Sequence, residues 1–174
     1  MTSLTLLGDT SGSIVLDAPA VSGSTTITFA AQSGTLNVGG PAFQARISGG
    51  NQGVSSGVAT KVTFNSEIFD TNSNYNPSTY RFTPTVAGYY QINAFISWAG
   101  TASTQGNIFI YVNGSSYAQT LTPGSGYGYN NSLSTIVPLN GSTDYVEVYA
   151  QNSSSEQIVF GAYSQFSGCF LRGL

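Results

Sequence analysis

Apolar and polar residues alternate over a long stretch in the middle of the chain. A repeat of two residues places one set on one face of a β-strand and its neighbours on the other. We therefore predict a strand at 89–98 with one face in the core. The core set is Tyr90, Ile92, Ala94, Ile96 and Trp98. The second face carries Tyr89 and Phe95 among polar residues, which is typical of a surface that packs against another subunit.

Shorter patterns of the same kind predict seven further strands after residue 40 and no helix. Two turn signals, Asn113-Gly114 and Asn140-Gly141, suit type I′ hairpins. Polar loops are expected at 48–57, 70–76 and 123–131. Strands packed this closely predict an all-β protein built as a two-sheet jelly-roll sandwich. The seven predicted ranges are 42–47, 61–65, 80–83, 107–113, 133–139, 144–151 and 162–172.

Residues 1–40 form a separate block that precedes the body at 41–174. Short strands are predicted at 3–7, 14–16 and 25–30, and each brings only two or three apolar side chains. So small a core does not support independent folding. We therefore expect this extended, β-rich segment to dock on a larger assembly through its apolar residues, Leu4, Leu6, Ile14, Leu16, Ile27 and Phe29.

Charge is scarce, which excludes some partners. Only 6% of the residues are charged, against about 25% in an average soluble protein. The basic residues Arg46, Lys61, Arg81 and Arg172 are scattered and the net charge is −3, so we expect no nucleic-acid partner. No apolar run is long enough to span a membrane, and the N-terminus has no secretory signal pattern. We expect synthesis in a cytoplasm and no membrane partner.

Catalytic chemistry has little support in the sequence. The chain has no His, and its single Cys169 is expected to lie buried in the last strand. Glu67 and Asp70 are the closest carboxylate pair, and a solvated loop is favoured over an acid-base role. Asp144 and Glu147 are expected on opposite faces of a strand. We therefore predict a protein that is not an enzyme and has no catalytic residues.

Calcium is the metal for which donors can be found. Asp70, Asn72 and Asn74 alternate as oxygen donors. The stretch lacks the Gly and terminal Glu of a calcium loop, and one carboxylate gives weak affinity. We expect no bound metal and no cofactor.

The order Tyr75, Phe82, Pro84, Gly88, Tyr90 resembles the central signature of the C1q/TNF-like jelly roll. Residues 41–45, 62–65 and 166–171 are similar to the first, second and closing strand motifs of that family. Tyr80 and Cys169 depart from the pattern, which usually has Gly and an aromatic residue there. The resemblance spans residue 41 to the C-terminus and implies a C1q/TNF-like sandwich.

The same resemblance implies a tight homotrimer around an axis lined by aromatic and apolar residues from one sheet. The candidate interface residues are Tyr89, Phe95, Tyr145 and Tyr149. The alternative is that these residues occupy the second face of the sandwich and are covered by loops.

The segment 11–36 resembles a short module of structural proteins of tailed bacteriophages. It shares a Gly-Ser before an apolar strand, an Ala-Pro, a Gly-Ser-Thr strand and a closing Gly-Thr-Leu. The resemblance implies a structural protein on the surface of a virion, made in the host cytoplasm and docked on a major capsid or tail protein. The chain has no long shaft or coiled coil, which favours a capsid decoration or cement protein over a tail fibre.

The loop at 123–131 supports a second hypothesis. It carries Tyr127 and Tyr129 on a Gly-rich backbone, and exposed tyrosines are natural contact residues. A tail-fibre or receptor-binding tip with lectin-like recognition of a host surface glycan would use these two residues at its distal end. Alternatively, they pack across a subunit boundary or down on the rim of the sandwich.

Overall fold

The computed structural model describes residues 4–7, 13–16, 39–99, 105–123, 129–154, 156–158 and 161–174. The chain divides into two units, Met1–Gly34 and Thr35–Leu174. In the first unit, β1 (Leu4–Leu7) pairs antiparallel with β2 (Ser13–Leu16), and the register joins Leu4 to Leu16 and Leu6 to Ile14. Both strands were predicted. The third predicted strand, with Ile27 and Phe29, lies outside the described residues.

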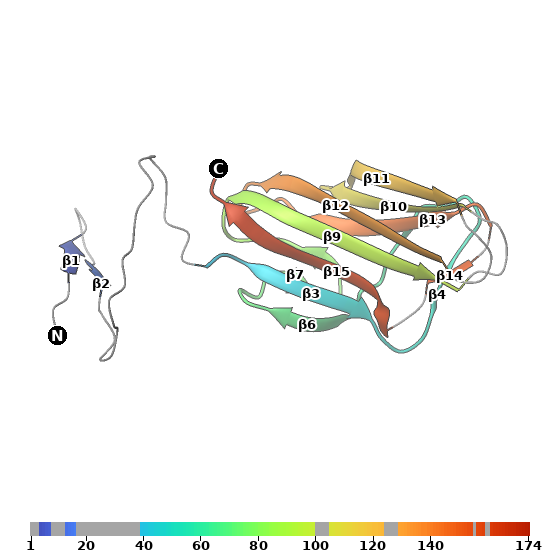
Figure 1. The fold of residues 1–174 in the computed structure, drawn as a ribbon, viewed down its shortest axis with the longest axis horizontal. Coiled ribbons are helices and arrows are strands. Elements are labelled where there is room, and N and C mark those ends of the chain that lie inside the picture. Colours follow the sequence, from blue (N-terminus) through green and yellow to red (C-terminus); the bar gives the residue numbers. More distant parts are fainter. Residues whose placement is uncertain are drawn as a thin grey trace, which may run out of the picture. The chain divides into compact units, whose positions relative to one another are not determined.

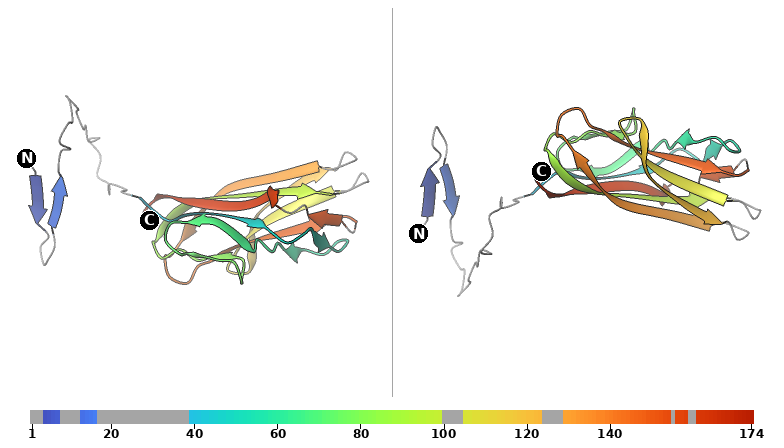
Figure 2. Two further views of the ribbon diagram at one scale, coloured as in Figure 1. Left: turned by 90° about the horizontal axis from the view of Figure 1, so that it is seen from below. Right: turned by 90° about the horizontal axis from the view of Figure 1, so that it is seen from above.

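The second unit consists of two antiparallel sheets stacked face to face (Figures 1 and 2). The β9 sheet has the order β4 (Gln52–Val54), β14 (Glu156–Ile158), β9 (Gly88–Trp98), β15 (Gly161–Arg172), β3 (Ala42–Ile47) and β6 (Ser66–Asp70), with β12 (Tyr129–Leu139) also paired to β9. The β13 sheet has the order β11 (Ser115–Pro123), β10 (Gln105–Val112), β13 (Val146–Asn152), β8 (Arg81–Phe82) and β7 (Tyr75–Asn76), with β5 (Thr60–Lys61) paired to β13. No helix occurs in the described part of the chain. The predicted all-β jelly-roll sandwich is confirmed.

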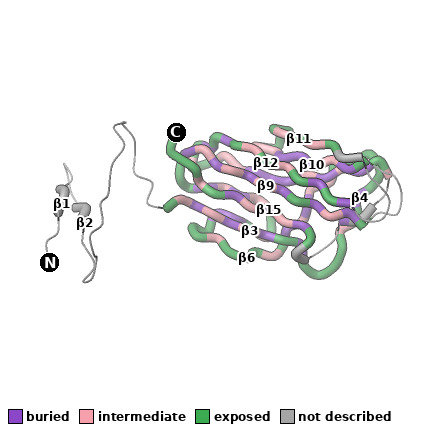
Figure 3. Tube along the Cα trace, viewed as in Figure 1, coloured by how far each residue is buried: buried purple, intermediate pink, exposed green. Residues whose placement is uncertain are grey.

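Burial alternates along β9 as the sequence predicts (Figure 3). Tyr90, Ile92, Ala94, Ile96 and Trp98 are all buried between the sheets, whereas the intervening residues are at least partly exposed. This alternation fixes the register, because a slip of one residue would exchange the two faces.

An aromatic cluster joins the two sheets at the centre of the core. Phe43 of β3 stacks on Tyr75 of β7 and on Phe82 of β8, with ring centroids 5.0 Å and 4.3 Å apart. It also meets the edge of Phe166 of β15, at 4.8 Å. Since these four side chains come from both sheets, their contacts hold the layers together.

The hydroxyl groups of Tyr75 and Tyr90, two tyrosines of the core, have backbone partners. The Tyr75 hydroxyl donates to the carbonyl of Phe64 at 2.7 Å, and that of Tyr90 donates to the carbonyl of Val86 at 2.6 Å. Burial raises the pKa of Tyr75, and it raises the pKa of Tyr90 to about 12. Both phenols are therefore neutral at physiological pH, and their hydroxyl groups are satisfied within the core.

Several strands differ from the predictions. β11 was missed because its sequence, SSYAQTLTP, has no regular apolar alternation, as suits a strand at the edge of a sheet. β4 lies within the predicted loop at 48–57, and β6 and β14 were not assigned to any predicted strand. β4 and β14 are only three residues long, which is too short for a repeat of two to be recognised. Of the predicted strand at 61–65, only Lys61 belongs to a strand, β5, although the Val62 amide still donates to the Val148 carbonyl.

Replacement of Phe43 tests the role of the aromatic cluster. We expect Phe43→Ala to lower the free energy of unfolding by about 3–5 kcal/mol, because it leaves a cavity among three packed rings. Phe69→Ala is the matched control, since Phe69 lies on the neighbouring strand β6 and is 45% exposed. Urea denaturation measures both variants, and equal losses would contradict the assignment.

Candidate functional site

One face of the sandwich combines apolar exposure with regular strand geometry. It is formed by the outward side chains of β12, β9, β15 and β3, and we call it the open face. Phe95 of β9, Ile136 of β12 and Leu171 of β15 are 37%, 50% and 41% exposed there. These strands are consecutive neighbours in the sheet, so the exposed apolar residues share a continuous surface. A face of this kind is typical of a protein interface.

The polar side chains of the open face bond to one another. The Gln91 side-chain amide donates to the Ser134 hydroxyl at 2.6 Å, and this hydroxyl donates to Oδ1 of Asn93 at 2.8 Å. The Gln44 amide donates to Oε1 of Gln165 at 2.6 Å. Because these groups already have partners, removing water from this face costs less than it would for unpaired amides.

Charged groups lie only towards the margins of the open face in the described strands. The outward residues of β9 and β12 include none, while Arg46 of β3 and Arg172 of β15 flank the centre. This face contains an apolar hollow of about 400 Å³. The hollow is lined by Tyr89, Ile136, Leu171 and Arg172. The Arg172 guanidinium is 5.6 Å from the centroid of the Tyr89 ring, which is a cation–π distance.

Cys169 lies on the open face, so its predicted burial is wrong. In β15 the residues Phe166 and Gly168 are buried, and Cys169 has the opposite parity. A side chain at Gly168 would meet Ile92 Cδ1 at 2.8 Å and Phe43 Cε1 at 2.9 Å. The glycine therefore lets β15 pack closely, and its neighbour Cys169 faces outward.

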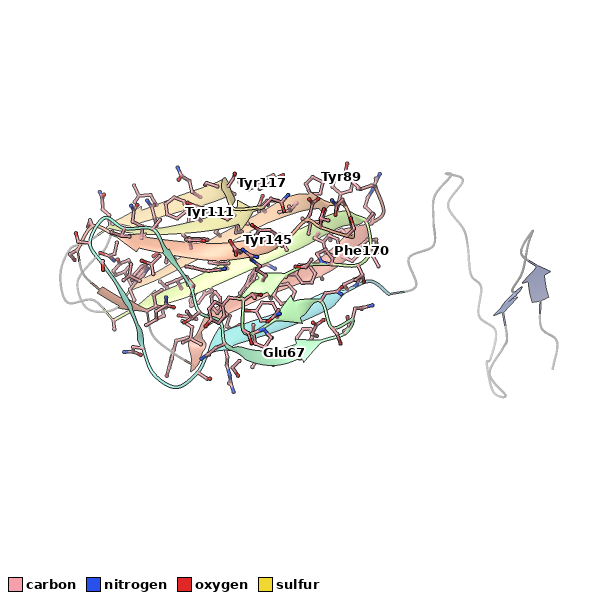
Figure 4. All side chains as sticks on the ribbon, turned by 180° about the vertical axis from the view of Figure 1, so that it is seen from behind. Glu67, Tyr89, Tyr111, Tyr117, Tyr145 and Phe170 are labelled. Carbon is pink, nitrogen blue, oxygen red and sulfur yellow. The ribbon has the colours of Figure 1, made fainter. Side chains whose placement is uncertain are left out.

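Tyr145 and Tyr149 do not share a face with Tyr89 and Phe95, which corrects the predicted interface. The strands β9 and β13 belong to different sheets. The Arg81 guanidinium lies 4.0 Å from the centroid of the Tyr145 ring, and Tyr149 stacks on Tyr111 at 4.2 Å. Figure 4 labels Tyr111 and Tyr145 on the β13 sheet. These tyrosines contact their own sheet rather than the open face.

Glu147 is buried on the outer side of the β13 sheet between two cations. Arg81 Nε donates to its Oε1 at 2.6 Å, and Lys61 forms an ion pair with the same oxygen. Burial alone would raise the pKa of Glu147, but the hydrogen bonds and charges of Lys61 and Arg81 outweigh it, and the pKa is lowered. The three residues are far apart in sequence, so no local pattern predicts this cluster.

Tyr129 is part of the core, which agrees with the alternative that it packs down on the sandwich and contradicts a role in an exposed ligand loop. It begins β12 opposite Trp98, stacks on that ring at 6.0 Å and is only 6% exposed. Its hydroxyl accepts a hydrogen bond from the Asn152 amide at 2.5 Å. The strand signal was obscured because Asn131, also buried, interrupts the apolar alternation. Tyr127 lies outside the described residues.

The candidate calcium donors form hydrogen bonds within their own loop, 70–76. Asp70 ends β6, and its carboxylate accepts from the backbone amides of Asn72 at 3.1 Å and Tyr75 at 2.6 Å. The Asn74 amide donates to the Asn72 carbonyl at 3.1 Å. Glu67 is exposed on the same strand. Within the described residues, no three side chains of Glu, Asp, Cys or His lie close enough together to bind a metal ion.

No helix in the described part of the chain is long and apolar enough to cross a membrane.

Removing the charge of Glu147 tests the ion cluster. We expect Glu147→Gln to lower the free energy of unfolding at neutral pH by about 1–3 kcal/mol, less than for a fully buried pair because both cations are partly exposed. The matched control Glu67→Gln, at an exposed carboxylate, should change it by less than about 0.5 kcal/mol. Similar losses in the two variants would argue against a stabilising cluster.

The lowered pKa also predicts a dependence on pH. The carboxylate binds a proton less readily in the folded protein, so its contribution is complete above the ordinary pKa of 4.5. That contribution is lost as the pH falls through the lower folded-state pKa. Urea denaturation at a series of pH values should show a steeper loss of stability below pH 4.5 in the wild type than in Glu147→Gln. Parallel curves would contradict the assignment.

Solved structures with the same fold come from several animals. The globular domain of zebrafish complement 1qA protein matches with a TM-score of 0.62 and 19% identity, covering 77% of this chain and 99% of that one. Eiger TNF from S. frugiperda matches with a TM-score of 0.62 and 11% identity, covering 78% and 95%. Murine APRIL matches with a TM-score of 0.58 and 8% identity, covering 75% and 98%. At these identities the likeness shows the fold alone.

Comparison with curated protein sequences gives no match. The family model of the C1q domain matches residues 42–171, which include every strand of the sandwich from β3 to β14 and all but the last residue of β15. The sequence motifs, the two-sheet topology and this match agree. The chain therefore belongs to the C1q domain family.

Proposed function

We propose that this protein is a non-enzymatic structural protein of a bacteriophage virion, a homotrimer that decorates or cements the capsid. Three copies turn their open faces to a common axis, and residues 1–40 attach each copy to the particle. The observation that carries the proposal is the open face, which exposes Phe95, Ile136 and Leu171, is poor in charge and has polar groups already hydrogen-bonded to one another.

The exposed apolar residues of that face support self-association. Burying an exposed aliphatic or aromatic side chain contributes about 1.5–3 kcal/mol, and Phe95, Ile136 and Leu171 are available in every copy. Tyr89 borders the hollow beside them. Rotational symmetry closes such contacts into a ring, and C1q/TNF-like domains are in general binding or structural modules, with a trimer implied by the resemblance. Tyr89 and Phe95 stay in the proposed interface, and Tyr145 and Tyr149 leave it.

Attachment through the first unit is supported by its small size. The β1–β2 register pairs apolar residues with each other, Leu4 with Leu16 and Leu6 with Ile14. A two-stranded hairpin is at best marginally stable alone, so it gains stability by docking on a partner. The virion, and the capsid or tail protein that would be that partner, rest on the resemblance of residues 11–36 to phage modules.

The copy number of the protein in particles tests the virion role. Quantitative peptide mass spectrometry on purified particles would compare this chain with the major shell protein. A near-stoichiometric ratio is the expected result for decoration or cement. A ratio many times lower would place the protein on the tail and favour the receptor-binding alternative, and absence from the particles would contradict the virion role.

A charge placed on the open face tests the trimer separately. We expect Ile136→Lys to convert the trimer into folded monomers, because a second cation would be buried beside Arg172 without an anion to pair with it. Leu121→Lys is the matched control, since Leu121 is 55% exposed on the β13 sheet, and it should remain trimeric. Light scattering after size exclusion gives the mass, and circular dichroism checks folding. A monomeric wild type, or a trimeric Ile136→Lys, would overturn this interface.

A further inference from the structure

Strand β11 (Ser115–Pro123) forms one edge of the β13 sheet (Figure 1). It pairs with β10 on one side, and no other strand in the described part of the chain pairs with it on the other side. The strand is nine residues long, contains no charged residue and has its only proline at its last position. A long, uncharged edge of this kind is a template for pairing with another chain.

The other sheet edges that the structure describes are protected. β4, β5 and β7 have only two or three residues each. β6 carries Glu67 and Asp70, and a register shift interrupts its pairing with β3. β12 contains Pro138, and the Tyr117 hydroxyl donates to its Ile136 carbonyl at 3.2 Å. Short length, charge, proline and irregular register all discourage edge pairing, so β11 is the exception.

The register shows which backbone groups of β11 point to its free edge. The Ser153 amide donates to the Gln105 carbonyl at 3.0 Å, at the start of β10. Because bonding alternates along antiparallel strands, odd-numbered residues of β10 bond towards β13 and even-numbered ones towards β11. The even-numbered residues of β10 lie opposite Thr120 and its even-numbered neighbours. The amides and carbonyls of Gln119 and Leu121 therefore point to the free edge.

This edge is complementary to itself. If two β11 strands run antiparallel about a twofold axis at Thr120, Gln119 of each copy lies opposite Leu121 of the other. These two residues have outward backbone groups, so each pair can exchange two hydrogen bonds. Thr120 then meets Thr120 of the second copy, which is a favourable cross-strand pair. Leu121, 55% exposed in the single chain, is partly covered by the Gln119 side chain of the second copy.

We propose that β11 of one copy pairs antiparallel with β11 of a second copy and joins their β13 sheets into one. A second copy fits better than an unrelated chain, because the same residues, 118–122, supply both halves of the contact and neither half carries charge. A register shift near Ile110 and Pro123 limit the contact at its two ends. So short a contact is weak in solution, and it gains strength where copies are held close together. The contact lies on the sheet opposite the open face, so it does not depend on the trimer.

Disulfide trapping in the full chain tests the register. Thr120→Cys, combined with Cys169→Ser to remove the native thiol, places two thiols opposite each other, with Cα atoms about 4.5 Å apart, which a disulfide can bridge. We expect a covalent pair of chains after mild oxidation. Ser115→Cys with Cys169→Ser is the matched control, since Ser115 is exposed on the same strand but lies far from its counterpart in this pairing. No covalent pair with Thr120→Cys, or equal yields in the two variants, would overturn the proposal.

A charge on the edge tests the contact without cysteine. Light scattering of the wild type at rising concentration should show its mass doubling, with a Kd on the order of 0.1 mM. Gln119→Lys should weaken this association at least about tenfold, because like charges meet across the paired strands, and circular dichroism should show a normal fold. Ser115→Lys is the matched control and should associate as the wild type does. A constant wild-type mass, or unchanged association of Gln119→Lys, would overturn the proposal.

The trimer and the β11 contact can fail separately. Ile136→Lys changes the open face and leaves β11 intact, so its monomers should still pair with the wild-type Kd. Loss of pairing in folded Ile136→Lys would contradict a contact through β11 alone.

Discussion

The alternation of residues along β9 is the constraint on which the rest of the structure depends. This strand lies inside its sheet, with β12 and β15 as paired neighbours over most of its length. Its inward side chains must therefore pack in the core, and the alternate side chains form the outward face of the sheet. Tyr90, Ile92 and Trp98 fill the space between the sheets. The outward residues could have been charged, yet they are amides, a serine and two aromatics. The open face can therefore contact water, and removing water from it costs little free energy.

The two outer faces of the sandwich differ in how their polar and charged groups are arranged. On the open face, Gln91, Asn93 and Ser134 satisfy one another, and charge is confined to the margins. On the β13 sheet, two of the four basic residues of the chain converge on Glu147, and a polar hollow lies further along the same sheet. A face with exposed apolar residues and with charge only at its margins suits contact with a second copy of the chain.

The sequence predicted what depends on local periodicity and missed what depends on long-range pairing. The two faces of β9 and the all-β sandwich follow from the repeat of two and from turn residues, so they were predicted correctly. Tyr129 was misplaced because Asn131 breaks the apolar pattern of β12, and only the pairing with Trp98 shows its burial. Cys169 was assigned to the wrong face because small residues such as Gly168 give no apolar signal. The Glu147 cluster joins residues from three separate strands and has no sequence signature.

The reactivity of Cys169 in the native protein tests most directly whether the open face is an interface. This thiol is exposed in the single chain and lies on β15 beside Gln91 of β9. Intact-mass analysis after timed treatment with a maleimide would give its rate of modification, with the denatured chain as reference. If three copies bury their open faces, the native protein reacts much more slowly than the denatured chain and recovers full reactivity on dissociation without unfolding. Modification of native Cys169 as fast as in the denatured chain, at concentrations where the protein is assembled, would contradict the account.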